Sequence, residues 1–305
     1  MNIGEIYKTA NWGKIKILDF QKGKSKILIQ FLNSKNTYLV EKIQIEKGCI
    51  EDYIEKENIL LKKEFPQNCG DILRILYKEK EYNHHYKEYY YRVKFKINNY
   101  ETFASLRDIK IGSVNNPYVP NICGVGFIGE EKYNYNINKF IYSKWLDMIH
   151  RCYDYKRERY SVYGAKGVTV CEEWHNFSNY LKWIKENSIW NTNNYDLMCD
   201  KDILANVNHL ENKIYSPETC LLIPDKINLF LVGDKYSGGV ENRKGRFRAI
   251  CKGKYLGTFN SFSEAKQVYA EEKYKIWVDL INKYLIPNNL KEILLKYDFS
   301  WYWLK

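Results

Sequence analysis

Basic side chains recur at alternate positions between residues 246 and 252, and this is the chain's clearest chemical pattern. If the segment is a strand, a period of two separates its side chains onto two faces. One face holds Arg246, Arg248, Ile250 and Lys252, and the other holds Phe247, Ala249 and Cys251. The apolar face can pack on a neighbouring element, which leaves aligned cations on the other face for an anionic partner.

The surrounding residues predict the elements that would hold these cations. Gly, Asn and Lys turns divide residues 238–260 into three short strands, and the sequence from Ser261 to Glu264 has the spacing of a helix capping box. A cationic sheet face suits the major groove of double-stranded DNA and is too wide for the minor groove. The expected DNA-binding residues are Arg243, Lys244, Arg246, Arg248, Lys252 and Lys254. The alternative is a basic hairpin on a solvated surface.

Residues 236–287 resemble the Apetala-two/ethylene-response-factor DNA-binding domain, whose three-stranded sheet lies in the major groove. The matching residues are Gly239-Val240, Arg246-Phe247-Arg248-Ala249, Leu256-Gly257-Thr258-Phe259 and the helix beginning near Glu264. The resemblance implies a DNA-binding domain at this end of the chain.

A second set of residues is dispersed in short blocks over residues 142–231. The blocks are Tyr142-Ser143-Lys144-Trp145 with Met148, Arg151-Cys152-Tyr153, Tyr163-Gly164, Val170-Cys171-Glu172-Glu173-Trp174, Phe177, Asp200-Lys201-Asp202, Tyr215 to Cys220, and Asn228. In this order they resemble a phage-encoded branch of the HNH homing endonucleases, proteins that often carry an Apetala-two-type domain after the nuclease region. The resemblance implies a ββα-metal fold at residues 123–233 and a phage or prophage protein.

Metal-dependent DNA cleavage is the activity that this resemblance implies. In HNH enzymes a strand ends in an Asp-His pair, the Asp binds a divalent metal, the His activates water, and the next helix adds a ligand. By position, Asp200 and Asn228 would bind Mg²⁺ or Mn²⁺, and Lys201 stands where the His is expected. Lysine is normally protonated at neutral pH and cannot accept a proton, so Lys201 predicts a slow enzyme or none. His209, in the following loop, is a substitute base if it folds inward, and otherwise a solvated loop residue.

Composition restricts the partners and the compartment. The 305 residues carry a net charge of +11, which favours a polyanion, and no 18-residue apolar run is present, which favours nucleic acid over membrane. Eight cysteines are scattered without a CxxC pair, which favours reduced thiols in a cytoplasm over zinc ribbons or disulfides. We also expect no secretory signal at the N-terminus.

The first 118 residues contain two similar segments. Phe31 and Phe95 lie 64 residues apart, as do Gly48 and Gly112, and alternating strands precede each phenylalanine. We therefore expect two small antiparallel β-modules, at 1–56 and 64–118, although chance similarity between Lys- and Ile-rich strands is the alternative.

The expected fold is α+β and multi-domain. The two β-modules precede the HNH-like region, the three-stranded sheet with its helix, and a C-terminal helix with an aromatic tail at 288–305. Within the HNH-like region we expect a strand at Leu197–Leu204, and we place His150 on a helix face or at a cap. Three functions remain open: a site-specific endonuclease, a catalytically inactive DNA-binding regulator, and an anti-defence protein that binds a host nucleoprotein complex. Each implies the cytoplasm of a bacterial host.

Overall fold

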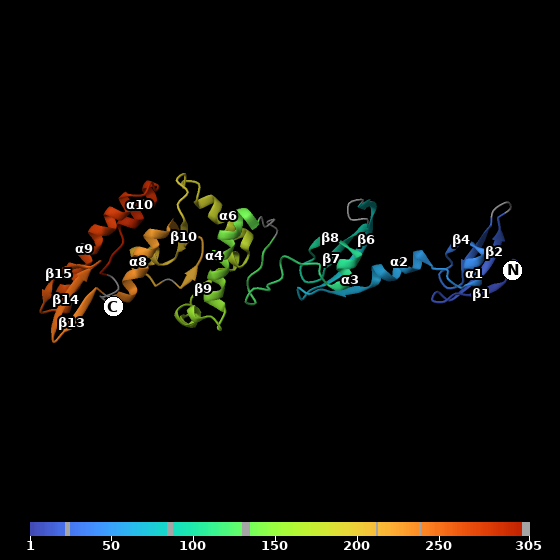
Figure 1. Cartoon of the computed structure of the whole chain (residues 1–305), viewed down its shortest axis with the longest axis horizontal. Coiled ribbons are helices and arrows are strands. Elements are labelled where there is room, and N and C mark those ends of the chain that lie inside the picture. The colour runs from blue at the N-terminus through green and yellow to red at the C-terminus, as the bar shows by residue number, and fades with distance from the viewer. Residues whose placement is uncertain (22–24, 84–87, 130–134, 212, 238, 301–305) are drawn as a thin grey trace. The chain divides into compact units, whose positions relative to one another are not determined.

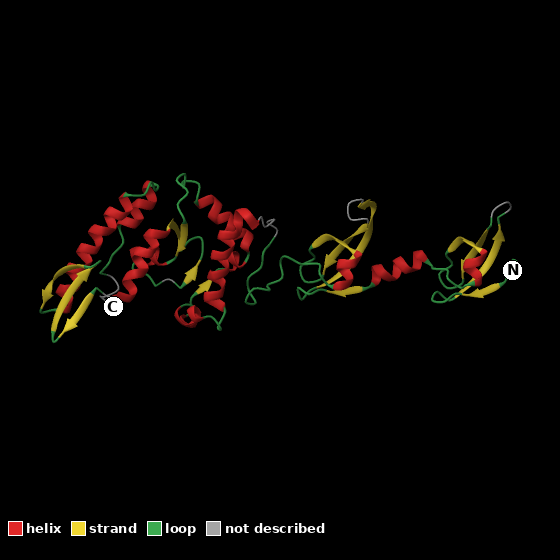
Figure 2. Cartoon of the chain, in the orientation of Figure 1, coloured by secondary structure: helices red, strands yellow, loops and turns green. Residues whose placement is uncertain are grey.

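The chain forms two compact units in the computed structural model, residues 1–119 and 120–305. The structure describes all residues except 22–24, 84–87, 130–134, 212, 238 and 301–305. Both units are mixed α and β, with small, mostly antiparallel sheets and helices (Figures 1 and 2). Among the described residues, no helix is both long and apolar enough to cross a membrane.

The first sheet has the order β1-β2-β3-β4 and is followed by a short helix. Its elements are β1 (Ile6–Lys8), β2 (Lys14–Phe20), β3 (Lys26–Phe31), β4 (Thr37–Glu41) and α1 (Lys42–Glu46). Alternate residues of β2 and β3 are buried, among them Ile15, Ile17 and Ile29, and they pack under α1 residue Ile45. This alternation is the reason that the segment folds as a one-faced sheet.

The second sheet repeats the same order of elements. These are β5 (Glu64–Pro66), β6 (Ile72–Asn83), β7 (Glu88–Phe95), β8 (Glu101–Ser105) and α3 (Leu106–Ile111), and α2 (Tyr53–Lys62) precedes them. Phe31 pairs with Ile15 in the first sheet, and Phe95 pairs with Leu73 in the second. The spacing from these partners to the phenylalanines grows from 16 to 22 residues because the β6–β7 hairpin is longer, so the 64-residue offset holds only after it.

The second unit begins around a tryptophan-rich core. Its elements are α4 (Tyr135–Tyr153), two 3₁₀ turns (Glu158–Val162 and Gly164–Lys166), β9 (Thr169–Val170), α5 (Glu172–His175) and α6 (Phe177–Asn187). Trp145 and Trp174 are fully buried, and the Trp145 indole Nε1 donates a 2.7 Å hydrogen bond to the Trp174 carbonyl. This core fixes α4, which supplies side chains to the sites described below.

A strand pair with helices follows. It consists of β10 (Leu197–Asp200), α7 (Asp202–Val207), β11 (Ile214–Tyr215), β12 (Leu221–Pro224) and α8 (Asp225–Ser237), with β10 antiparallel to β12. The expectation of a strand from Leu197 to Leu204 is wrong beyond residue 200. Asp200 Oδ1 accepts the backbone N–H groups of Asp202 and Ile203, both at 2.9 Å, and thereby begins α7.

The last part contains a three-stranded sheet and two helices. They are β13 (Val240–Arg243), β14 (Arg246–Cys251), β15 (Lys254–Phe259), α9 (Phe262–Asn282) and α10 (Asn288–Leu295). Helix α9 begins as predicted, since Ser261 Oγ accepts the Glu264 N–H. One core joins α8 residues Ile227 and Phe230 to Trp277 of α9 and Leu294 of α10, so the ββα segment and the C-terminal helices pack together. The predicted aromatic tail at 301–305 lies outside the described residues.

Candidate nucleic-acid interface

Strand register places three arginines on one face of the C-terminal sheet. Arg243 lies opposite Arg246, and Arg248 lies opposite Glu241 on one side and Thr258 on the other. Directly paired residues in antiparallel strands share a face. The residues of this face, hereafter the arginine face, are Glu241, Arg243, Arg246, Arg248, Ile250, Tyr255 and Thr258.

The opposite face of the sheet is buried against α9. Ala249 and Cys251 are fully buried, and the Phe247 ring packs edge-on against Phe262 at 5.6 Å. Gly239, which precedes β13, has a φ of +61°, and a Cβ added there would lie 2.0 Å from the Tyr269 ring. Sheet and helix are therefore in close contact, and the arginine face is the side that faces away from α9.

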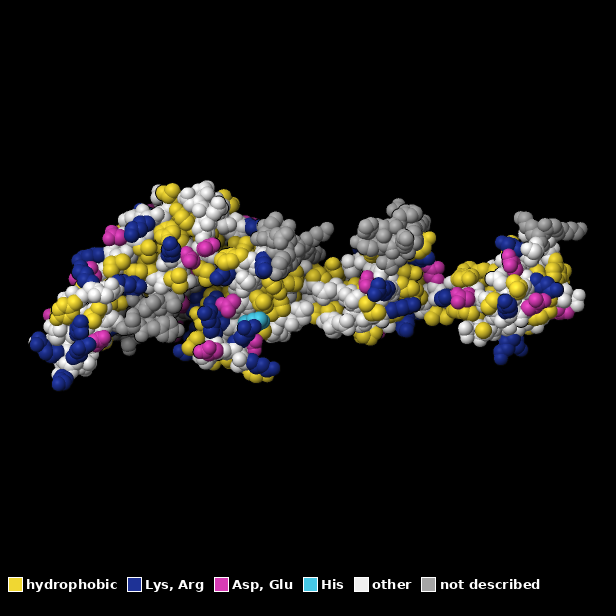
Figure 3. All heavy atoms as spheres, viewed as in Figure 1, with side chains coloured by type: hydrophobic (Ala, Val, Ile, Leu, Met, Phe, Trp, Pro, Cys, Tyr) yellow, Lys and Arg dark blue, Asp and Glu magenta, His cyan; other side chains and the backbone are white. Residues whose placement is uncertain are grey.

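The arginine face is basic, with one acidic residue. Arg243 Nη2 lies 3.1 Å from Glu241 Oε2, an exposed ion pair that costs little to break. The Arg248 guanidinium lies 5.4 Å from the centre of the Tyr255 ring, which holds the cation over the sheet. Lys and Arg side chains gather where the strands β13–β15 end (Figure 3).

The predicted lysines lie off this face. Lys244 and Lys252 each precede a glycine in a two-residue turn with positive φ at both positions, the type I′ geometry of tight hairpins. Because β14 ends at Cys251, the alternation stops before Lys252, and the expectation that Lys252 shares the arginine face is wrong. Lys252 Nζ lies 4.8 Å from the Phe230 ring centre, and Lys254 Nζ pairs with Glu272 Oε1 of α9 at 2.7 Å.

The residues expected to form a metal site have other contacts in the structure. Asp200 lies at the end of β10 and caps α7, as described above. Lys201 is buried, and its ammonium lies 2.6 Å from Asp202 Oδ1 and 5.7 Å from the centre of the Tyr215 ring. His209 is exposed, in a left-handed backbone conformation after α7.

Asn228 lines a pocket of about 620 Å³ between α4, β10 and the start of α8. Among the described residues, neither Asp200 nor Lys201 lines this pocket, although Met198 and Cys199 of β10 do. The structure therefore brings Asp200 and Lys201 together as chain neighbours and places Asn228 at a separate surface.

The same pocket contains cations that sequence reasoning did not select. Lys144, Arg151 and Arg159 line it, and the Arg151 guanidinium lies between the rings of Tyr163 and Tyr215, at 5.0 and 4.8 Å. Arg151 Nη1 is 3.9 Å from Asp147, and its Nε has no hydrogen-bond partner among the described residues. The sequence placed Arg151 off the apolar stripe of α4 but gave no signal that two tyrosines distant in sequence would enclose it.

Comparison with protein-family models, with curated proteins and with solved structures found no match for this chain.

Proposed function

We propose that this protein binds double-stranded DNA, with the arginine face in the major groove. The observation that supports the proposal is the strand register that aligns Arg243, Arg246 and Arg248 on one open side of the sheet. Three strands span about 10 Å, from two inter-strand spacings of about 4.8 Å. The major groove is about 12 Å wide and the minor groove about 6 Å, so only the major groove admits this sheet.

The electrostatics and the side-chain types fit such a partner. Arginine donates paired hydrogen bonds to guanine edges and to phosphates, and Tyr255 and Thr258 add hydroxyl donors on the same face. The chain's net charge of +11 adds an attraction that does not depend on DNA sequence.

The proposal is tested by titrating a fluorescent duplex with the full chain at fixed salt. Replacing both arginines of β14, as Arg246→Ala/Arg248→Ala, should weaken binding at least about tenfold, since each contact is worth roughly 1–3 kcal/mol. Lys254→Ala removes one positive charge from the same sheet, but from a side chain paired with α9, and should change the affinity less than about threefold. Equal affinity of wild type and the double variant would refute the proposed interface.

Metal-dependent cleavage is a second candidate, favoured by the order β10–β12–α8, which is that of a ββα-metal segment. Asp200→Asn separates the two uses of this side chain, because the amide oxygen can still cap α7 while the charge that a metal needs is lost. If Asp200 binds catalytic Mg²⁺ or Mn²⁺, the wild type nicks supercoiled plasmid and the variant does not. If neither protein nicks DNA with either metal, the cleavage candidate is excluded and DNA binding remains.

A further inference from the structure

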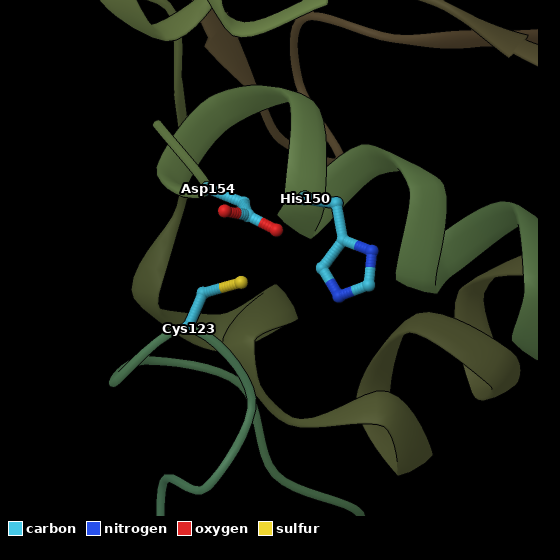
Figure 4. Close-up of side chains that lie close together, drawn as sticks. All are labelled: Cys123, His150 and Asp154. Carbon is cyan, nitrogen blue, oxygen red and sulfur yellow. The ribbon is translucent and has the colours of Figure 1, made fainter. Parts of the chain in front are cut away.

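Three side chains with different metal-binding groups converge between α4 and the turn at residues 122–126. Cys123 Sγ, a ring nitrogen of His150 and a carboxylate oxygen of Asp154 all lie within 4.8 Å of one another (Figure 4). His150 belongs to the last turn of α4, and Asp154 follows the end of that helix. The site thus draws its groups from two segments that are separated by more than twenty residues.

The turn holds Cys123 in place through backbone hydrogen bonds. Ile122 and Gly126 exchange two of these, at 3.0 and 2.8 Å, and Val125 N donates to Ile122 O at 3.1 Å. Cys123 and Gly124 have φ values of 51° and 73°, so the cysteine occupies a left-handed position that favours glycine or asparagine.

The turn is also packed directly on α4. Ile122, Cys123 and Val125 contact the core that contains Trp145 and Ile149. Gly126 lies so close to Trp145 that an added Cβ would be 3.2 Å from the indole ring. The packing of the turn therefore sets the position of the Cys123 thiol relative to α4.

Helical spacing sets the other two groups. Residues four apart on a helix face the same side, and the Asp154 N–H donates to the His150 carbonyl at 2.8 Å, which continues the helical turn to Asp154. The Asp154 carboxylate accepts the Lys156 N–H at 3.1 Å, and its second oxygen lies 3.5 Å from Arg157 Nε. These contacts orient the carboxylate, as outer partners of metal ligands do. The Arg157 side chain is largely exposed and can move away when a cation arrives.

We propose that Cys123, His150 and Asp154 bind a zinc ion, with a water molecule as the fourth ligand. One thiolate, one imidazole and one carboxylate form a donor set that suits Zn²⁺ and not Mg²⁺ or Ca²⁺, which take oxygen ligands. Tetrahedral zinc with bonds of about 2.0–2.3 Å holds its donors about 3.3–3.8 Å apart. Closing from 4.8 Å to that spacing requires side-chain movements of about 1 Å. The bound ion would join the turn at 122–126 to the end of α4, independently of any DNA contact.

Cobalt substitution in the full-length protein provides the test, because Co²⁺ occupies zinc sites and a cobalt–thiolate bond absorbs in the near ultraviolet. After chelation and buffer exchange, the wild type should bind one equivalent of Co²⁺ with this absorption, and one equivalent of Zn²⁺ should displace it. Cys123→Ser should abolish the absorption, and Asp154→Asn and His150→Gln should each weaken Zn²⁺ binding at least about 100-fold, since losing even an outer-shell partner costs 10–100-fold.

Cys49→Ser is the matched control, because Cys49 is an exposed thiol outside the cluster. It should keep the wild-type absorption and Zn²⁺ affinity. Circular dichroism of each metal-free variant verifies that the fold is retained. A wild type without the thiolate absorption, or a folded Cys123→Ser variant that keeps it, would overturn the proposal.

Discussion

At the scale of single residues, Lys273 of α9 is a lysine buried inside the apolar core of the second unit. It is fully buried, and its ammonium lies 4.5 Å from the centre of the Phe230 ring. Burial lowers the pKa of Lys273 to about 8. The folded state therefore loses this proton at a lower pH than the unfolded chain, where a lysine holds it up to about pH 10.

Lys273→Met should stabilise the protein at pH 7, by about 1 kcal/mol or more, because an apolar side chain of similar length replaces a desolvated charge. The advantage should shrink as the pH rises through about 8 toward 10, because the wild type gains stability once its folded state is neutral at this site. Denaturant unfolding between pH 6 and 10 measures this difference. Lys275→Met, at an exposed position of the same helix, is the control and should show neither effect. A stability difference that does not vary with pH would contradict the account.

At the scale of elements, α7 begins because of the side chain that ends β10. Asp200 Oδ1 accepts two backbone N–H groups of this six-residue helix, and the negative charge lies at the helix N-terminus, where it is favourable. Asp200→Ala should therefore lower the free energy of unfolding by about 1 kcal/mol, with a range of about 0.5–2.

Asp200→Asn keeps an acceptor oxygen and should recover most of this loss, as measured by thermal or denaturant unfolding in the absence of metal. Equal stability of the wild type and the alanine variant would show that the carboxylate does not support α7. Because the measurement uses no metal, its outcome is independent of whether Asp200 also binds one.

Periodicity predicted the parts of the fold that depend on local sequence. The burial alternation of β14 and the start of α9 at Ser261 follow from residues within a few positions of each other. The prediction failed where a tertiary contact decides. Leu197 to Leu204 reads as one apolar strand, but the capping bonds of Asp200 end it after four residues. Lys252 continues the alternation on paper, but the turn rotates it toward Phe230.

Clusters assembled from distant segments could not be predicted from spacing. His150 reads as a helix-face or capping residue, and nothing local indicates that Cys123, 27 residues earlier, approaches it. The same holds for Arg151, which is enclosed by Tyr163 and Tyr215. The arginine face was predictable because its residues lie in strands joined by two-residue turns.

At the scale of the whole molecule, the account assigns DNA binding to the second unit. Residues 120–305 contain the arginine face, and their cores share no residue with the cores of the first unit. A fragment of residues 120–305 should therefore fold alone and bind a duplex with an affinity within about tenfold of the full chain. A folded fragment that does not bind DNA would place the interface in the first unit, and parallel titrations of fragment and full chain decide between these outcomes.

The salt dependence of DNA binding tests the central claim most directly, because it counts the phosphate contacts that cations make. For a B-form duplex, the slope of log K against log salt is about −0.9 per phosphate neutralised. If Arg246 and Arg248 each contact one phosphate, the Arg246→Ala/Arg248→Ala variant should have a slope less steep than that of the wild type by about 1.8, while Lys254→Ala leaves the slope unchanged. Identical slopes for the wild type and the double variant would show that the arginine face does not contact DNA.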